Sequence, residues 1–227
     1  MESQGIKYSV DLVLCIDATG SMGNIIGRVK ENAVKFHSDL YERMKKKDKE
    51  IDSLRVKVIT FRDFYVDGEH SMLESRFYSL PQEEKDFADF VSKVYANGGG
   101  DEPENGLEAV AAAIKSDWTK IGEKKRQVIV VWTDASTHPL EKDASAKPGN
   151  YPAGLPKTFD ELTDLWDGQS SPMSLSAKRL ILFTPDADCW TTMATYWQNT
   201  LHCPSKAGNG LGEMEYGTMF DVIVNSI

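Results

Sequence analysis

The sequence lacks several features that mark particular classes of protein. It has only three cysteines, Cys15, Cys189 and Cys203, and an odd number without paired spacing is not a disulfide framework. Neither a CxxC nor an HxxxH spacing occurs, so the sequence does not indicate a zinc site. No apolar run approaches the length of a membrane span, and the first residues, MESQGIKYSV, contain no apolar signal region. We therefore expect a cytoplasmic protein with no membrane partner.

Positive charge is also scarce. The 26 Lys and Arg residues are outnumbered by 35 Asp and Glu residues, which gives a net charge of −9. This balance argues against a nucleic-acid partner, which requires a basic surface, and it fits a soluble protein that holds cations. With 227 residues, of which 41% are hydrophobic, the composition is typical of one globular domain spanning residues 1–227.

The most informative stretch is YSVDLVLCIDATGSM, near the start of the chain. Its apolar run, Val10 to Ile16, predicts a buried strand. Asp17, Thr19 and Ser21 follow at alternate positions, and a helical pattern then runs from Met22 to Met44. Side chains that offer only oxygen suit a hard cation such as Mg2+ or Ca2+. The alternative is that these residues only cap the helix, because Asp, Ser and Thr are preferred caps.

The remaining pattern predicts an α/β fold. Further strands are expected at Leu54–Phe61, Gln127–Thr133, Arg179–Thr184 and Asn199–Cys203, with an antiparallel edge strand within Glu74–Leu80. Further helices are expected from Pro81, over Glu104–Ser116, Thr158–Asp167 and Trp190–Thr200, and over Met219–Ile227. Buried strands that alternate with helices predict a doubly wound, mostly parallel sheet with one antiparallel edge strand and helices on both faces.

The ends of the predicted strands bring acidic residues together. Asp17 and Asp134 each follow a buried strand, and the loop 98–101 opens on the same edge of the sheet. Carboxylates so arranged would repel each other, and a bound divalent cation is the simplest compensation. The expected metal ligands are therefore Asp17, Thr19, Ser21, Asp101 and Asp134.

Three sequence features together resemble the von Willebrand factor type A domain. They are Asp-x-Thr-Gly-Ser after a buried strand, a Gly-Gly loop before a helix, and Thr-Asp after a later strand. The resemblance implies a metal-ion-dependent adhesion site (MIDAS) for Mg2+ or Mn2+, with Ca2+ as a further candidate. It makes Asp17, Thr19 and Ser21 the ligands of the first loop and Asp134 the acid of the third. The Gly-Gly-Gly-Asp-x-Pro-Glu loop is similar to that of intracellular members, including bacterial and alpha-kinase-associated ones.

Asp101 departs from the family pattern, because it stands where the family usually has a threonine. If Asp101 ligated the metal directly, the site would already be negative before a partner carboxylate arrived. Our hypothesis is that Asp101 reaches the metal through water, or that the site favours neutral or hydroxyl ligands from the partner. The alternative is that Asp101 only caps the following helix.

The resemblance implies a non-catalytic protein-interaction module, in which a protein partner donates an oxygen ligand to the metal. We expect the long connection Ala135 to Lys157 to shape its specificity. One alternative is a Mg2+-dependent phosphohydrolase of the haloacid dehalogenase type, although Thr19 occupies the place of that family's second acid. Another is a structural domain with a vestigial site. The sequence indicates no oligomeric state.

Three other residues near the predicted edge have ordinary explanations. We expect Arg62 to form a local salt bridge with Asp63 and Trp190 to be buried in the core. His138 is expected to be an ordinary loop residue, with contact to a partner or catalysis as its alternative roles.

Overall fold

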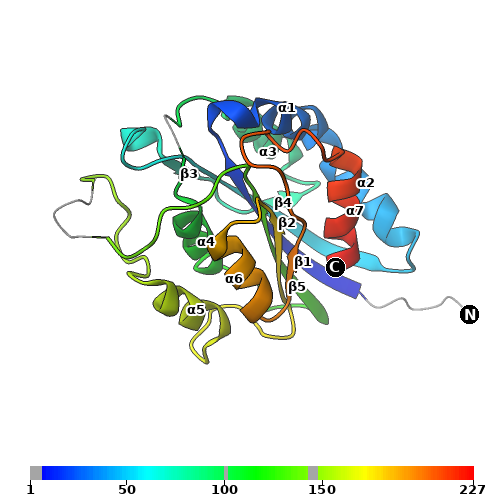
Figure 1. Ribbon diagram of the computed structural model, residues 1–227. Helices are drawn as coiled ribbons and strands as arrows, with labels where there is room; N and C mark the ends of the chain where they lie inside the picture. The colour runs from blue at the N-terminus through cyan, green and yellow to red at the C-terminus, as the bar shows by residue number, and fades with distance from the viewer. Residues whose placement is uncertain (1–6, 100–101, 143–147) are drawn as a thin grey trace, which may run out of the picture.

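The computed structural model describes residues 7–99, 102–142 and 148–227. Within these ranges, seven strands form one sheet that lies between two layers of helices (Figure 1). The strands are β1 (Lys7–Asp17), β2 (Glu50–Phe61), β3 (Met72–Glu74), β4 (Tyr78–Leu80), β5 (Lys124–Trp132), β6 (Lys178–Phe183) and β7 (Thr200–His202). The α-helices are α1 (Gly23–Asn32), α2 (Phe36–Lys45), α3 (Glu84–Lys93), α4 (Gly106–Ile114), α5 (Phe159–Asp167), α6 (Asp188–Tyr196) and α7 (Tyr216–Ser226).

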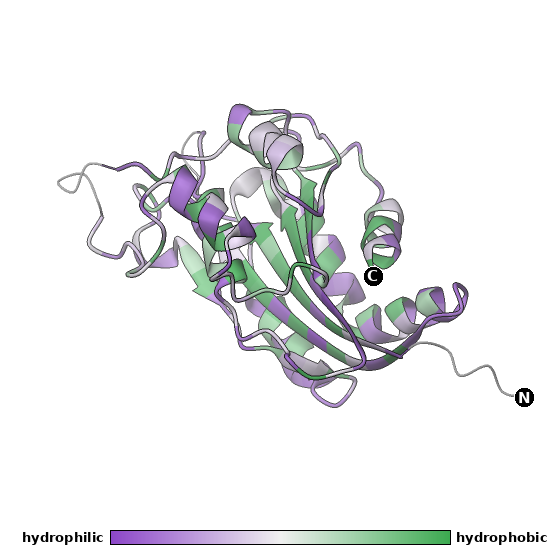
Figure 2. Cartoon of the chain, turned by 90° about the horizontal axis from the view of Figure 1, so that it is seen from below, coloured by the Kyte–Doolittle hydropathy of each residue, from purple (hydrophilic) through white to green (hydrophobic). Residues whose placement is uncertain are grey.

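The central strand β1 organises the sheet. The strand order is β3-β2-β1-β5-β6-β7, and β1 is parallel to both β2 and β5. Successive residues of β1 contribute to different cores, because Leu14 faces one helix layer and Cys15 faces the other. Burial on both faces explains why this strand reads as a continuous apolar run, and Figure 2 shows the middle of the sheet as hydrophobic.

The two helix layers confirm the doubly wound arrangement. Helices α1, α2, α3 and α7 supply one core, and α4, α5 and α6 supply the other. Helix α4 is buried along its whole length, which its many alanines permit. Trp190 is fully buried against this layer, as expected from the sequence. None of the described helices has both the length and the apolar character needed to cross a membrane.

The antiparallel edge lies where it was predicted, but the segment Glu74–Leu80 does not form one strand. It contributes to two short strands, β3 and β4, which both pair antiparallel with β2. Between them the hydroxyl of Ser75 accepts a hydrogen bond from the backbone N–H of Val58 at 2.9 Å. That side-chain contact takes the place of a backbone partner and interrupts the ladder.

The predicted single helix from Met22 to Met44 is wrong. The chain forms α1 and α2, separated by a 3-10 turn at Ala33–Lys35 and preceded by another at Gly20–Met22. At the break, the side chain of Asn32 donates a hydrogen bond to the carbonyl of Arg28 at 2.7 Å. Asparagine competes in this way with the helix backbone, although the apolar stripe continues across the turn.

The close packing of α4 predicts an unequal response of two helical glycines to alanine. A Cβ on Gly106 would lie 2.7 Å from the indole of Trp190, whereas a Cβ on Gly27 in α1 would meet nothing within 4 Å. We expect Gly106→Ala to destabilise the protein by about 1–3 kcal/mol through overpacking. The matched change Gly27→Ala should stabilise it by about 0.5–1 kcal/mol. Urea denaturation measures both, and equal effects of the two changes would contradict the packing described here.

Candidate metal centre

The carboxylate of Asp17, at the end of β1, is completely buried. Its Oδ1 accepts hydrogen bonds from the backbone N–H of Thr19 at 2.9 Å and from the hydroxyl of Thr19 at 2.6 Å. Its Oδ2 accepts a hydrogen bond from the hydroxyl of Thr133 at 2.6 Å. Thr133 directly follows β5. Because β1 pairs with β5, as predicted, the loops that follow these two strands lie side by side.

Four of the five predicted ligands form one chain of oxygen atoms. The hydroxyls of Thr19 and Ser21 lie 3.5 Å apart, and the hydroxyl of Ser21 donates to Oδ1 of Asp134 at 2.9 Å. Asp17 and Asp134 are buried, whereas Ser21 is exposed. The oxygen atoms therefore lead from the core of the protein to its surface. The fifth predicted ligand, Asp101, lies outside the described residues.

A loop far along the chain holds Asp134 in place, which sequence reasoning missed. The backbone N–H of Gly210 donates to Oδ2 of Asp134 at 2.6 Å, and the N–H of Gly208 donates to its carbonyl at 2.8 Å. Gly210 has a φ of +55°, and a Cβ there would lie 2.2 Å from the carbonyl oxygen of Ser21. Glycine is thus required for this close approach. The Gly-Asn-Gly sequence marked a turn, but nothing in it indicated contact with the site.

The electrostatics of the site are set by its two acidic side chains, Asp17 and Asp134. In the described part of the chain, neither Asp17 nor Asp134 forms an ion pair. Burial raises the pKa of Asp17 from an ordinary value of 3.8 to about 6, and the charge of Asp134 adds to the rise. Hydrogen bonds from Thr133 and Thr19 act in the opposite direction. The site therefore keeps a carboxylate in the interior that a divalent cation would stabilise.

The donor set fits a hard divalent cation. Two carboxylates and two hydroxyls offer only oxygen, which is the chemistry of Mg2+, Mn2+ and Ca2+ sites. No group of three or more Asp, Glu, His or Cys side chains converges as a metal site within the described ranges. A cation held here would thus depend on the hydroxyls of Thr19 and Ser21 as well as on the acids.

The second loop brings an unexpected acid close to Thr19. Gly99 has a φ of +68°, and a Cβ on it would lie 2.6 Å from the methyl carbon of Thr19 and 2.8 Å from Oε1 of Glu104. Glu104 is buried, and its backbone pairs with the segment after Asp134. The sequence placed Glu104 only at the start of a predicted helix. The Gly-Gly dipeptide thus lets the backbone pass between two polar side chains of the site.

Arg62 ties three loops together around the site. Its guanidinium donates to the carbonyls of Ala18 at 2.9 Å, His70 at 2.7 Å and Tyr95 at 2.8 Å, and the side chain is buried. The expected salt bridge with Asp63 is wrong, because the guanidinium is committed to these carbonyls. A planar group with five N–H donors can satisfy several carbonyls that converge on it.

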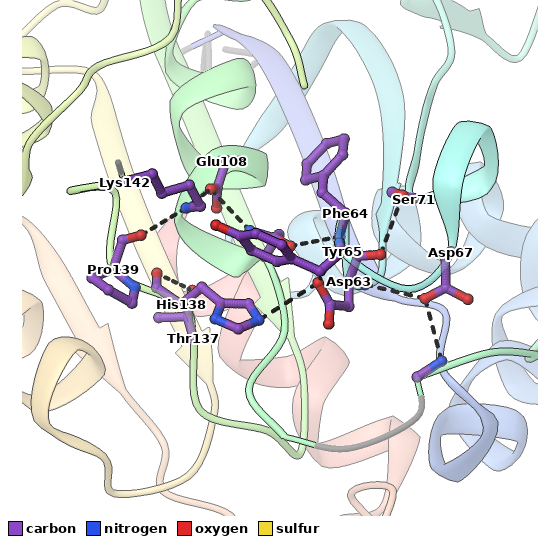
Figure 3. Close-up of polar contacts among 12 residues, drawn as sticks. Asp63, Phe64, Tyr65, Asp67, Ser71, Glu108, Thr137, His138, Pro139 and Lys142 are labelled. Carbon is purple, nitrogen blue, oxygen red and sulfur yellow. Dashed lines mark hydrogen bonds and ion pairs between the residues drawn. The ribbon is translucent and has the colours of Figure 1, made fainter. Parts of the chain in front are cut away.

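Asp63 is paired instead with the loop that follows β5. Its Oδ1 lies 3.5 Å from Nε2 of His138, and the His138 ring lies 5.1 Å from that of Tyr65 (Figure 3). The backbone N–H of Asp63 donates to the carboxylate of Asp67 at 3.2 Å, and this carboxylate also accepts a hydrogen bond from the N–H of Gly99 at 3.3 Å. His138 therefore connects the loop after β5 with the loop after β2 instead of standing alone in solvent.

A buried ion pair fixes the long loop to α4. Oε1 of Glu108 accepts a hydrogen bond from Lys142 at 2.6 Å (Figure 3). It also accepts hydrogen bonds from Tyr151 at 2.8 Å and Asn105 at 2.9 Å. The side chains of Glu108 and Lys142 are 0% and 3% exposed, so the pair is shielded from solvent. Asn105 in turn accepts from the backbone N–H of Phe64 at 2.7 Å. The predicted specificity loop is thus attached to the frame of the site.

We predict that Asp17→Asn makes the metal-free protein less sensitive to pH. The raised pKa means that ionisation of Asp17 opposes folding as the pH rises from about 3.8 to about 6, and the full effect is present above that range. A shift of about two units corresponds to about 3 kcal/mol. In EDTA, the variant should therefore gain stability relative to wild type between pH 4 and pH 7.5, as measured by urea denaturation. A constant difference between the two proteins across this pH range would refute the assignment.

We predict that Glu108→Gln destabilises the protein by about 3–5 kcal/mol, because it leaves the buried ammonium of Lys142 without a counter-charge. The double variant Glu108→Gln/Lys142→Met should recover part of the loss. Asp89→Asn breaks the exposed pair with Lys85 and is the matched control, for which we expect an unchanged denaturation midpoint. Chemical denaturation of the four proteins decides whether burial makes the difference.

Comparisons with known proteins bear on the family to which this chain belongs. The von Willebrand factor A domain profile matches residues 11–147, which contain the first and second loops and Asp134. The alpha-protein kinase vwkA of Dictyostelium discoideum is 30% identical over 158 residues. That match covers 69% of this chain but only 23% of the kinase.

Solved structures with little sequence similarity share the fold. The pilus adhesin SpaC of Lactobacillus rhamnosus GG has a TM-score of 0.54 at 14% identity, with 97% of this chain and 31% of the adhesin covered. Proximal thread matrix protein 1 of the mussel byssus has a TM-score of 0.51 at 9% identity, with 97% and 48% covered. Together, the profile match over most of the chain and the fold place this protein in the von Willebrand factor A domain family.

Proposed function

We propose that this chain is a non-catalytic protein-interaction module that binds its partner through a divalent cation of the Mg2+ type. The observation that carries the proposal is the line of oxygen atoms from Asp17 through Thr19 and Ser21 to Asp134, which reaches the surface at Ser21. Membership of the von Willebrand factor A family supports a role in protein interaction.

Each proposed ligand is held by contacts that fix its orientation. Thr133 holds one oxygen of Asp17, and the N–H of Gly210 holds one oxygen of Asp134. The hydroxyls of Thr19 and Ser21 stand between the acids, where they can turn their lone pairs toward a cation. When bound, the cation would supply an open coordination position for an oxygen of the partner.

The charge balance favours an oxygen ligand from outside. Asp17 and Asp134 together carry two negative charges, which a divalent cation neutralises. An incoming carboxylate or hydroxyl then meets no net negative charge from these two residues. The role of Asp101 in this balance remains the prediction made from the sequence, because that residue lies outside the described ranges.

The contacts of Asp17 support a binding role over phosphohydrolase chemistry. Both of its carboxylate oxygens accept hydrogen bonds from Thr19 and Thr133, and the side chain is completely buried. A nucleophilic carboxylate needs an oxygen directed at its substrate. The kinase activity named for the relative vwkA is not transferred, because this chain spans less than a quarter of that protein.

We predict that Mg2+ or Mn2+ raises the melting temperature of the wild-type protein relative to EDTA, with Ca2+ as a comparison. A ligand that binds only the folded state stabilises it by about 2.7 kcal/mol at a hundredfold excess over its dissociation constant. The rise should be absent in Asp17→Ala and reduced in Ser21→Ala, which removes only an exposed hydroxyl. Differential scanning calorimetry gives the shifts.

The control for the hydroxyl is Ser38→Ala, since Ser38 is an exposed serine on α2 whose hydroxyl donates to the carbonyl of Lys35 in the preceding turn. It should keep the full response to the cation. Capture of a partner that EDTA and Ser21→Ala both abolish, but Ser38→Ala does not, would support the interaction role. If no cation shifts the melting temperature, or if Ser21→Ala and Ser38→Ala respond alike, the proposed site is wrong.

A further inference from the structure

A compact cluster of cations lies at the opposite end of the sheet from the candidate metal centre. Tyr8 stands at the start of β1, and three cationic groups surround its ring. The Nζ atoms of Lys49 and Lys124 lie 5.7 Å and 5.0 Å from the ring centroid, and the guanidinium carbon of Arg126 lies 5.2 Å from it. These four residues are called the Tyr8 cluster below. Figure 2 shows the strand ends near the N-terminus as hydrophilic, in contrast to the middle of the sheet.

No Asp or Glu side chain in the described part of the chain pairs with the cations of the Tyr8 cluster. Of the Asp and Glu carboxylates in the described ranges, none lies within ion-pair distance of Lys49, Lys124 or Arg126. Arg126 donates to the terminal carboxyl group of Ile227 at 2.8 Å and to the backbone carbonyl of Lys125 at 3.0 Å. In a chain with 35 acidic and 26 basic residues, carboxylates are abundant. A group of cations that forms no ion pair with these Asp and Glu side chains is therefore a distinct feature of this surface.

The cationic groups act on one another and on Tyr8. Burial alone would raise the pKa of Tyr8, but a hydrogen bond from Lys124 and the charges of Lys124, Lys49 and Arg126 outweigh it and lower the value. Burial lowers the pKa of Lys49, and the charges of Arg126, Lys47 and Lys124 lower it further. Burial lowers the pKa of Arg179 on β6, and the charge of Arg126 lowers it further. The cluster thus repels its own charges, and a bound anion would relieve that repulsion.

We infer that the Tyr8 cluster is a binding site for a multivalent anion that carries phosphate groups. Its two ammonium groups are mobile point charges, and its guanidinium is a planar fork of donors. Phosphate oxygens accept hydrogen bonds from both kinds of group, and charge-assisted bonds of this type are the strong ones. The three cations come from two segments that flank β1, Lys49 just before β2 and the other two at the start of β5, so they converge on one point instead of following one helix.

A purely structural role makes the opposite prediction. The cations lie near the C-terminal ends of α2 and α7, as the bond from Arg126 to Ile227 shows, and such ends favour positive charge. If the cations served only the helix ends, their removal would destabilise the protein. If they form an unoccupied anion site, their removal relieves repulsion and leaves the stability unchanged or increased.

The test uses the full chain in EDTA, so that its outcome is independent of the candidate metal centre. We expect inositol hexakisphosphate to raise the melting temperature by several degrees compared with KCl at equal ionic strength. The double variant Lys49→Gln/Lys124→Gln should lose this rise and melt at or above the wild-type temperature without the anion. The control Lys35→Gln/Lys85→Gln removes two exposed lysines elsewhere and should keep the rise.

Vesicles distinguish the source of the phosphate. Flotation with phosphatidylcholine vesicles, with and without phosphatidylinositol bisphosphate, reports binding to a lipid headgroup, and the melting shift reports binding of a soluble phosphate compound. Binding in either assay that the double variant loses and the control keeps supports the site. If neither assay responds, if the control loses the response as well, or if the double variant is destabilised without the anion, the inference is wrong.

Discussion

The buried carboxylate of Asp17 is the constraint on which the site depends. An ionised group in the interior is unfavourable unless hydrogen bonds or an opposite charge stabilise it. Here Thr19 and Thr133 supply hydrogen bonds from two different loops, and Asp134 adds a second negative charge nearby. The sheet therefore places the carboxylate of Asp17, which has no positive counter-charge, next to oxygen atoms that could bind a cation. In the proposed function, a divalent cation completes this arrangement.

The core of this arrangement could be predicted from the sequence, because it follows from rules of strand pairing. The run Val10–Ile16 is apolar except for Asp11, and an apolar run of this length indicates a strand in the centre of the sheet. Parallel neighbours end on the same edge, and this rule places Asp17 beside Asp134. Thr19 and Ser21 follow because a turn after the strand carries them to the same point.

The frame around these ligands could not be predicted, because it consists of contacts between distant loops. The N–H of Gly210 binds Asp134 across 76 positions of sequence, and no periodic pattern records such a contact. Arg62 was assigned to the adjacent Asp63 on proximity in sequence, but the convergence of three carbonyls decided its position. Glu104 was expected only at the start of a helix, and the path of Gly99 shows that it lies beside the site. Local sequence signals therefore identified the oxygen side chains that gather at the candidate site but not what holds them.

The attachment of the long loop has a consequence for how such a module can vary. Lys142 and Tyr151 both contact Glu108, so the eight residues between them start and end at one buried point on α4. The entropy lost on closing a loop grows only with the logarithm of its length, so that changing the number of residues between fixed ends has a small effect on folding. This segment can therefore be lengthened, shortened or exchanged while Glu108 keeps both ends in place. In the proposed function, variation of the recognition loop and constancy of the frame are separated at the side chain of Glu108.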